Sequence, residues 1–276
     1  MAEPNDEDPP RNRSRRDRDD DDRPRRRDDD DDYDDRPRRR RPEGESKGSS
    51  GLMIAAIVGG VLLVGCIVVG VLVALLLPAV TKVRQAAARM NDQNNMKQLS
   101  LGVLNYESNN GKLPPAQEKV SWRVYILPYI EQESLYRQFK VDESWDSPTN
   151  KRHASTRIKT FVSAADPPEM AETRYRVFVG PDTLYEPGKP LPTSRSAKDG
   201  PAATILIVES GDTVPWPQPR EIQYDRAGAL PSFGVPGRGG FNVAMLDGSV
   251  KFVSDKTSSD VIRGGIEPND NRLFEP

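Results

Sequence analysis

Few residues of the types that most often carry chemistry occur in this chain, and none falls into a catalytic pattern. His153 is the only histidine and Cys66 the only cysteine. His153 lies in a polar stretch, residues 150–157, with no nucleophile in a recognisable motif, so we expect an exposed loop or helix position. Because zinc sites use several His and Cys ligands, the usual zinc centres are excluded. The sequence predicts no catalytic residue, no cofactor and no metal site.

Motifs for ester and nucleotide chemistry are also missing: the Gly-x-Ser-x-Gly elbow, the P-loop and the dinucleotide fingerprint. The glycine cluster at residues 237–240 precedes a strand pattern instead of a helix that could bind phosphate. Residues 209–212, ESGD, follow an apolar strand pattern, where functional residues often gather. Two carboxylates in a turn define no reaction by themselves. We therefore expect no enzymatic activity and keep a hydrolase as the third hypothesis.

Two groups of residues leave binding alternatives open. The stretch IEPNDN, residues 266–271, offers oxygen ligands of the kind that Ca²⁺ takes, although its spacing matches no defined loop such as the EF-hand. Trp122, Trp145 and Trp216 fit core or loop anchors, the interpretation we favour, or a surface that binds sugars or peptides. We assign neither group to a site.

Asp247 and Gly248 carry the best local structural signal of the chain, and we predict them to be structural turn residues. They separate two apolar-rich runs, FNVAML and SVKFVS, and Asp-Gly between such runs is typical of a two-residue type I′ hairpin. That turn would place apolar side chains on one buried face and a lysine on the other. The predicted pairs are Met245 with Val250 and Val243 with Phe252 on the buried face, and Ala244 with Lys251 on the outer face.

The longest element begins with an uncharged apolar run over residues 52–77. As a helix these 26 residues span roughly 39 Å, against about 30 Å for the hydrocarbon core of a bilayer. We predict a single transmembrane helix over 52–77, with the lipid bilayer as its partner. Cys66 ends a short match to a lipoprotein cleavage box, LVGC, but the long charged segment before it is unlike a signal peptide. Lipidation of Cys66 stays an open alternative.

Residues 1–51 form a segment of mixed charge, with 15 Lys/Arg and 18 Asp/Glu and almost nothing apolar. Such a segment buries too little surface to offset its ordering entropy, so we predict a disordered tail. Its acidic runs cancel the field of its basic blocks, and we expect no nucleic-acid partner. Basic residues flank both ends of the apolar run, more densely on the N-terminal side. The positive-inside comparison is therefore mixed. The denser N-terminal cluster, and a highly charged tail that is easier to leave inside than to export, favour a cytoplasmic tail and an extracytoplasmic head.

Residues 78–276 are predicted to form one α+β domain. Apolar residues at spacings of three, four and seven after Pro78 predict an amphipathic helix over 79–107, which continues the membrane helix and is stopped by Asn109-Asn110-Gly111. We expect this long, pilin-like helix to pack on an antiparallel sheet of the head, residues 110–276. Further candidates are strands over 174–179 and 204–208 and helices over 130–139 and 255–264.

Several motifs in a fixed order resemble a large planctomycetal family of pilin-like proteins, the domain-of-unknown-function 1559 family. They touch most of residues 74–265 and are LLLPAVTKVRQAAARMNDQNNMKQLSLGVLNYESNNGKLPPA, SWRVYILPYIEQESLYRQFKVDESWDSP, DGPAATILIVESGDTVPW and GGFNVAMLDGSVKFV. Two features depart from the family pattern. SSGLMIAAIVGG lacks the prepilin junction, in which Gly-Phe precedes a Glu, and Gly237 stands where the C-terminal His-x9-Asp-Gly signature has its His. A permanent anchor is therefore expected in place of cleavage and filament assembly.

These observations give an ordered set of functional hypotheses. The first is a membrane-anchored, pseudopilin-like structural or interaction protein of the cell envelope, with other envelope or secretion-system proteins as partners. The alternative is a membrane-tethered solute- or glycan-binding module on the same anchor. The sequence names neither the ligand nor the oligomeric state.

Overall fold

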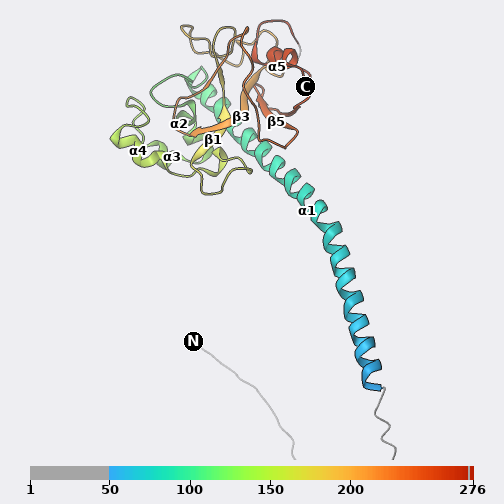
Figure 1. Ribbon diagram of the computed structural model, residues 1–276. Helices are drawn as coiled ribbons and strands as arrows, with labels where there is room; N and C mark the ends of the chain where they lie inside the picture. Colours follow the sequence, from blue (N-terminus) through green and yellow to red (C-terminus); the bar gives the residue numbers. More distant parts are fainter. Residues whose placement is uncertain (1–49, 273) are drawn as a thin grey trace, which may run out of the picture. The chain divides into compact units, whose positions relative to one another are not determined.

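The computed structural model describes residues 50–272 and 274–276 (Figure 1). The chain forms two units, residues 1–60 and 61–276, of which the second contains the head. The predicted disordered tail lies outside the described residues except for its last two, Ser50 and Gly51, which are helical. The predicted fold class is confirmed for the rest, since a long apolar helix packs on an antiparallel sheet.

Helix α1, Ser50–Asn110, is 61 residues long and covers both the predicted membrane helix and the predicted amphipathic helix. Pro78 lies within it without ending it. Its large apolar side chains from Leu52 to Leu77 are exposed, and among the described residues α1 is the one helix with the length and composition to cross a membrane. The helix ends where Gly111 adopts a φ of 72° and donates from its N to the carbonyl of Glu107 at 2.7 Å.

Only the C-terminal part of α1 is buried against the head. Met96, Leu99 and Val103 recur at helical spacing and are at most 1% exposed. Gly102 lies on the same stretch, where a Cβ would approach Ile130 to 3.0 Å, so the absence of a side chain allows close packing. The stripe of apolar residues thus fixes this end of the helix to the head.

The main sheet has four antiparallel strands in the order β1-β3-β5-β6. The strands are β1, Glu172–Arg176, β3, Ile205–Pro215, β5, Gly240–Met245, and β6, Val250–Ser254. A second, two-stranded sheet pairs β2, Phe178–Val179, in parallel with β4, Ile222–Gln223. The predicted strand over 174–179 is therefore divided between two sheets, and β3 extends far beyond residue 208, through residues 209–212 that we expected to form a turn.

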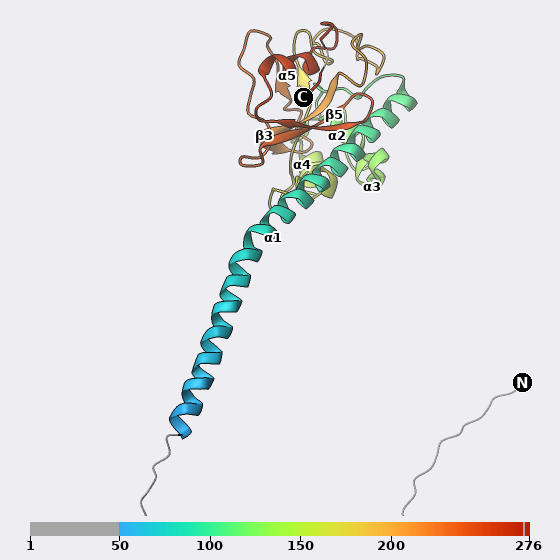
Figure 2. The ribbon, with the colours of Figure 1, turned by 90° about the vertical axis from the view of Figure 1, so that its right-hand side faces the viewer.

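Helices cover both faces of the main sheet. Figure 2 shows the sheet between α5, Ser259–Ile266, and the C-terminal part of α1. Ile262 and Ile266 of α5 pack with Val243 and Val253, whereas Leu99 of α1 belongs to the core on the other face. The sheet therefore separates two hydrophobic clusters, one under each helix.

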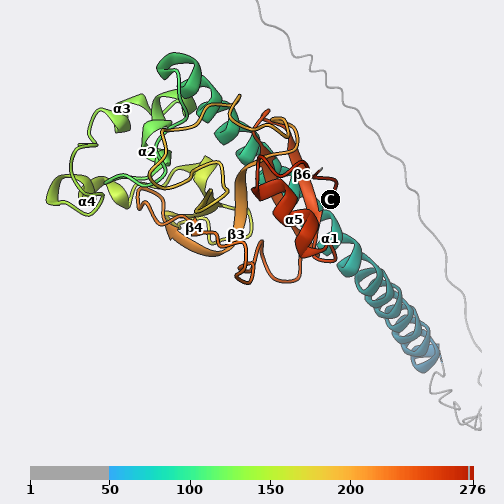
Figure 3. The same ribbon diagram turned by 90° about the horizontal axis from the view of Figure 1, so that it is seen from above.

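Short helical turns gather on the β1 side of the sheet, away from α5 (Figures 1 and 3). They are α2, Trp122–Tyr125, η1, Leu127–Ile130, α3, Glu133–Tyr136, α4, Pro148–Ala154, and η2, Lys159–Phe161. The helix predicted over 130–139 is replaced by two turns because Glu131 adopts a left-handed φ of 62° between them. The helix predicted over 255–264 begins later, where the Ser258 side chain accepts from the N of Val261.

The β5–β6 hairpin differs by one residue from the predicted register. Ala244 pairs with Val250, and Val243 pairs with Lys251. The connection is a turn from Met245 to Gly248, closed by a 2.9 Å bond from the N of Gly248 to the carbonyl of Met245. The predicted type I′ turn was wrong because fully buried Leu246 enters the turn, and only Gly248, with a φ of 82°, needs the left-handed conformation.

Candidate functional site

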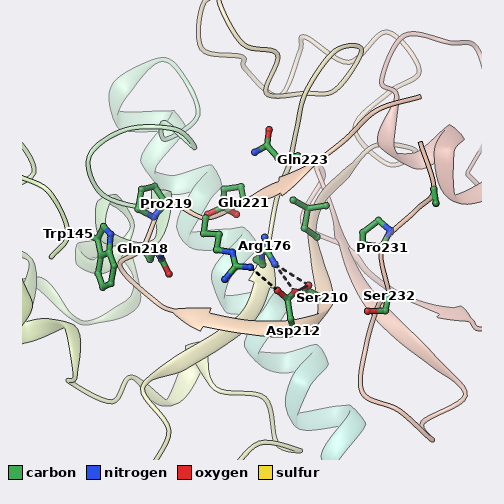
Figure 4. Close-up of a pocket in the computed structure, with 13 residues that line it drawn as sticks. Trp145, Arg176, Ser210, Asp212, Gln218, Pro219, Glu221, Gln223, Pro231 and Ser232 are labelled. Carbon is green, nitrogen blue, oxygen red and sulfur yellow. Dashed lines mark hydrogen bonds and ion pairs between the residues drawn. The ribbon is translucent and has the colours of Figure 1, made fainter. Parts of the chain in front are cut away.

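A polar pocket of about 690 Å³ lies beside β3, between the segment 218–223 and the loop 229–232. Figure 4 shows Arg176 in its centre, with Trp145 and Gln218 on one side and Pro231 and Ser232 on the other. The volume falls within the range of roughly 300–1,000 Å³ that is common for small-molecule sites. This pocket is the candidate site because charged groups from three separate segments converge in it.

The floor of the pocket is a three-residue polar cluster. Ser210 and Asp212 are two positions apart in β3, so both side chains leave the same face of the strand. Arg176, the last residue of β1, donates from Nη1 to Asp212 Oδ1 at 2.7 Å and to Ser210 Oγ at 3.4 Å. Ser210 Oγ in turn donates to the same carboxylate oxygen at 2.6 Å. Partial burial opposes ionisation of Asp212, but the hydrogen bond from Ser210 and the charge of Arg176 outweigh it and lower the pKa of Asp212.

The wall of the pocket contains a fully buried ion pair. Arg123 of α2 and Glu221 have no exposed side-chain surface, and Arg123 Nη2 lies 3.1 Å from Glu221 Oε1. Arg123 also donates to the carbonyls of Trp216, Tyr175 and Gln218 at 2.8, 2.9 and 3.1 Å. Since the charge of Glu221 is neutralised by Arg123, this carboxylate fixes the wall and adds no free charge to the pocket.

Two arginines that line the pocket have N–H groups without a close partner. Arg176 is 6% exposed, and its Nε is buried without a hydrogen-bond partner among the described residues. Arg220 is largely exposed and approaches Asp212 only to 4.0 Å. A buried guanidinium with an unmade hydrogen bond is uncommon, because each such bond stabilises the protein when it is formed.

The three tryptophans fall into two groups. Trp122 and Trp216 are fully buried, which confirms the core interpretation for both. Trp145 is only half-buried and lines the pocket. It precedes α4 in a loop held by a 2.9 Å bond from its own N to the carbonyl of Lys119. An aromatic ring is therefore available at the pocket margin.

A second polar cluster, which the sequence reading missed, joins α1 to the sheet. Asp92 is fully buried and accepts four hydrogen bonds, from Ala164 N at 2.7 Å, Tyr175 Oη at 2.9 Å, Ser163 Oγ at 3.2 Å and Arg238 Nη1 at 2.5 Å. Burial, followed by the charge of Asp92, raises the pKa of Tyr175 well above its ordinary value. The tyrosine thus keeps its proton as a donor to the helix carboxylate.

Glu209 completes this cluster from β3. Its carboxylate accepts from Arg238 Nη1 at 3.2 Å and from the N and Nδ2 of Asn242 at 3.1 and 3.2 Å. Burial and the nearby charge of Asp92 raise the pKa of Glu209. Asp92 stands four residues before Met96, at a core-facing position of the helix. A carboxylate in an apolar stripe is the sequence signal that could have identified it.

The residues that the sequence singled out lie elsewhere. Asp247 and Gly248 sit in the β5–β6 turn, where Lys97 Nζ donates to the Gly248 carbonyl at 2.6 Å. Gly237 lies in a loop with open space around its Cα, and His153 lies in α4 with its ring 5.9 Å from that of Phe139. In the 266–271 stretch considered for calcium, the Glu267 carboxylate pairs with two arginines. They are Arg226 at 2.7 Å and Arg272 at 2.8 Å.

A family model described as protein of unknown function (DUF1559) matches residues 81–204. These residues, called the DUF1559 segment below, are therefore similar to that family. No protein of a curated set matches the chain, and no solved structure matches it. The DUF1559 segment supplies Asp92, Arg123, Trp145 and Arg176, whereas Ser210, Asp212 and Arg238 lie beyond its matched end. Both polar clusters are therefore formed jointly by the DUF1559 segment and the C-terminal strands.

Within the part of the chain that the structure describes, no group of three or more His, Cys, Asp or Glu side chains is arranged to hold a metal ion. The pocket around Arg176 is lined by two serines and two carboxylates, but not by His153, which lies in α4. The side chains that line it offer hydrogen bonds and charge to a ligand.

Proposed function

We propose that this protein is a membrane-anchored, pilin-like structural or interaction protein that holds its head outside the cytoplasm and catalyses no reaction. The observation that carries the proposal is the division of α1 into an exposed apolar part and a part buried in the head. Exposed apolar side chains along a stretch of this length are costly in water and favourable in lipid. The same helix then serves as both anchor and core element.

The Asp92 cluster supports the structural side of this proposal. A helix that carries an anchor must transmit force to the head, and the four hydrogen bonds to Asp92 tie α1 to β1, to the loop at residues 163–164 and to Arg238. We expect these bonds to hold the C-terminal part of α1 on the head. The expected partners are other envelope or secretion-system proteins, and the charged tail faces the cytoplasm.

Single-cysteine labelling tests the topology. In a Cys66→Ala background, Asp142→Cys places a thiol on the exposed surface of the head, and Ser14→Cys places one in the tail. A membrane-impermeant maleimide should label Asp142→Cys in intact spheroplasts and Ser14→Cys only after permeabilisation. The reverse pattern would overturn the proposed orientation, and labelling of both without permeabilisation would overturn the anchor.

Partner capture tests the interaction role. If the head makes the contacts, tagged full-length protein should retain a set of envelope proteins. A tagged protein that lacks residues 1–50 should retain the same set equally well. Loss of all partners on removal of the tail would instead assign the interaction to the tail.

The second candidate is a membrane-tethered solute- or glycan-binding module. The pocket around Arg176 favours it, because its charged and aromatic side chains converge from separate segments. A ligand that binds the folded protein raises its stability, and the increase grows with the ratio of ligand concentration to Kd. A thermal-shift screen of the full-length protein in detergent therefore separates the two candidates.

A further inference from the structure

The pocket around Arg176 carries one uncompensated positive charge. Two guanidinium groups, Arg176 and Arg220, lie at the single carboxylate of Asp212. The other acidic residue that lines it, Glu221, is paired with buried Arg123. Electrostatics therefore favour a ligand with one negative charge over a neutral or cationic one.

Arg176 is positioned to recognise that charge. Its side chain is 7% exposed and is held by Asp212 through Nη1. The unpartnered Nε is itself buried, so a ligand would meet the exposed part of the side chain. The guanidinium has five N–H donors in a fixed fork that matches the geometry of a carboxylate. Because the group is already buried and oriented, a ligand would meet little entropic cost in ordering it.

The remaining surface of the pocket favours a ring that carries hydroxyl groups. Trp145 lines one side with a half-buried indole, against which the C–H face of a sugar ring can pack. Gln218, Gln223 and Ser232 line the same pocket and offer both donors and acceptors. An apolar ligand would leave these polar groups without partners, whereas sugar hydroxyls would satisfy them.

We propose that this pocket binds a hexuronic acid, with its carboxylate at Arg176 and Arg220 and its pyranose ring against Trp145. This inference names the ligand class of the binding-module candidate and rests on that candidate, not on the membrane topology. The ligand is either a free sugar acid or the end of an acidic glycan, since both present the same carboxylate and ring.

Calorimetric titration of the full-length protein in detergent tests the inference with D-glucuronate and D-galacturonate. Glucose and galactose supply the ring without the carboxylate, and acetate supplies the carboxylate without the ring. We expect at least one uronate to bind about tenfold or more tightly than its neutral sugar and than acetate, since charged hydrogen bonds contribute that much. Its affinity should fall as salt is raised.

Variants locate the binding. Arg220→Gln, at an exposed side chain, should weaken uronate binding at least about fivefold while leaving the fold intact. Trp145→Ala should weaken the uronate and any neutral sugar alike. Arg176→Gln should abolish uronate binding, with circular dichroism to check that the variant folds. Arg137→Gln is the matched control, because Arg137 is exposed and lies outside the pocket.

The outcomes separate the inference from the candidate function beneath it. If a uronate and its neutral sugar bind with equal affinity, and Trp145→Ala abolishes both, the sugar-acid inference is overturned. The proposal of a binding module would still stand. Uronate binding that is unchanged in Arg220→Gln and Trp145→Ala would overturn the assignment to this pocket. No binding of either uronate would overturn the inference outright. A short acidic oligosaccharide that binds more tightly than the monomer would identify a glycan as the source.

Discussion

The carboxylates of Asp92 in α1 and Glu209 in β3 lie on either side of one nitrogen, Nη1 of Arg238, at 2.5 and 3.2 Å. Both carboxylates are fully buried, and the arginine side chain is 13% exposed. One cation therefore offsets two buried anions, and neutral donors satisfy the remaining lone pairs. This shared arginine is where the long helix is joined to the centre of the sheet.

Asp92→Ala should destabilise the head strongly. It removes the acceptor for Ala164, Ser163 and Tyr175 and leaves two buried donors, Ser163 Oγ and Tyr175 Oη, without this partner. Breaking a buried ion pair typically costs about 3–5 kcal/mol. Near-ultraviolet circular dichroism of the detergent-solubilised protein should show a lower Tm. Asp142→Ala, at an exposed aspartate, is the control, and an equal Tm for both variants would contradict the role assigned to Asp92.

Glu209 should make the stability of the head depend on pH. Its folded pKa is raised above the ordinary value of 4.5 by burial and by Asp92, so the folded state binds a proton more tightly than the unfolded state. The contribution of Glu209 to the free energy of unfolding should therefore fall as pH rises from about 4.5 to the raised pKa, and then level off.

Urea unfolding at several pH values, for the natural protein and Glu209→Gln, measures this dependence. The difference in unfolding free energy between the two should decrease with rising pH in that window. Glu133→Gln, at an exposed glutamate, should leave the profile unchanged. A difference that grows with pH would mean that Arg238 lowers the pKa of Glu209 more than burial raises it.

Local sequence patterns predicted the positions of helices and strands better than they predicted which residues pair between strands. The apolar run and the helical spacing after Pro78 indicated a helix from the membrane segment into the head. Both signals depend only on residues within a few turns of the same helix. The Asp-Gly signal located the β5–β6 hairpin, but the register depended on the burial of Leu246, which no turn propensity encodes.

The polar clusters could not be predicted in the same way. Asp92 and Arg238 are 146 residues apart, and Arg123 and Glu221 are 98 residues apart. The sheet brings these residues together from distant parts of the chain. No fixed sequence spacing therefore indicates that they pair. Residues 209–212 stand out in the sequence because they follow an apolar run. Their alternation in β3, with Glu209 facing one cluster and Ser210 the other, became visible only with the strand in place.

Arg123→Lys should lower the free energy of unfolding nearly as much as Arg123→Ala. Arg123 makes three bonds to backbone carbonyls besides its pairing with Glu221, and a lysine ammonium cannot reproduce this planar fork. We expect a loss of about 3 kcal/mol or more in the free energy of unfolding, because one ammonium cannot satisfy the Glu221 carboxylate and all three carbonyls in this buried site. Arg137→Lys, in an exposed pair, should change it by less than about 0.5 kcal/mol. Similar small losses for both would contradict the structural role of the buried fork.

Substitutions in the β5–β6 turn distinguish the observed turn from a type I′ turn. Only Gly248 needs a positive φ, and a Cβ there would lie 3.3 Å from Leu104 of α1, so Gly248→Ala should cost about 1–2 kcal/mol. Asp247→Ala removes bonds from the exposed Ser249 N and Oγ and should cost under about 1 kcal/mol. In a type I′ turn both positions would have positive φ, and both alanines would be strained. Equal losses of stability in urea unfolding would therefore argue for that turn, whereas a clear excess for Gly248→Ala supports the register in which Leu246 is buried.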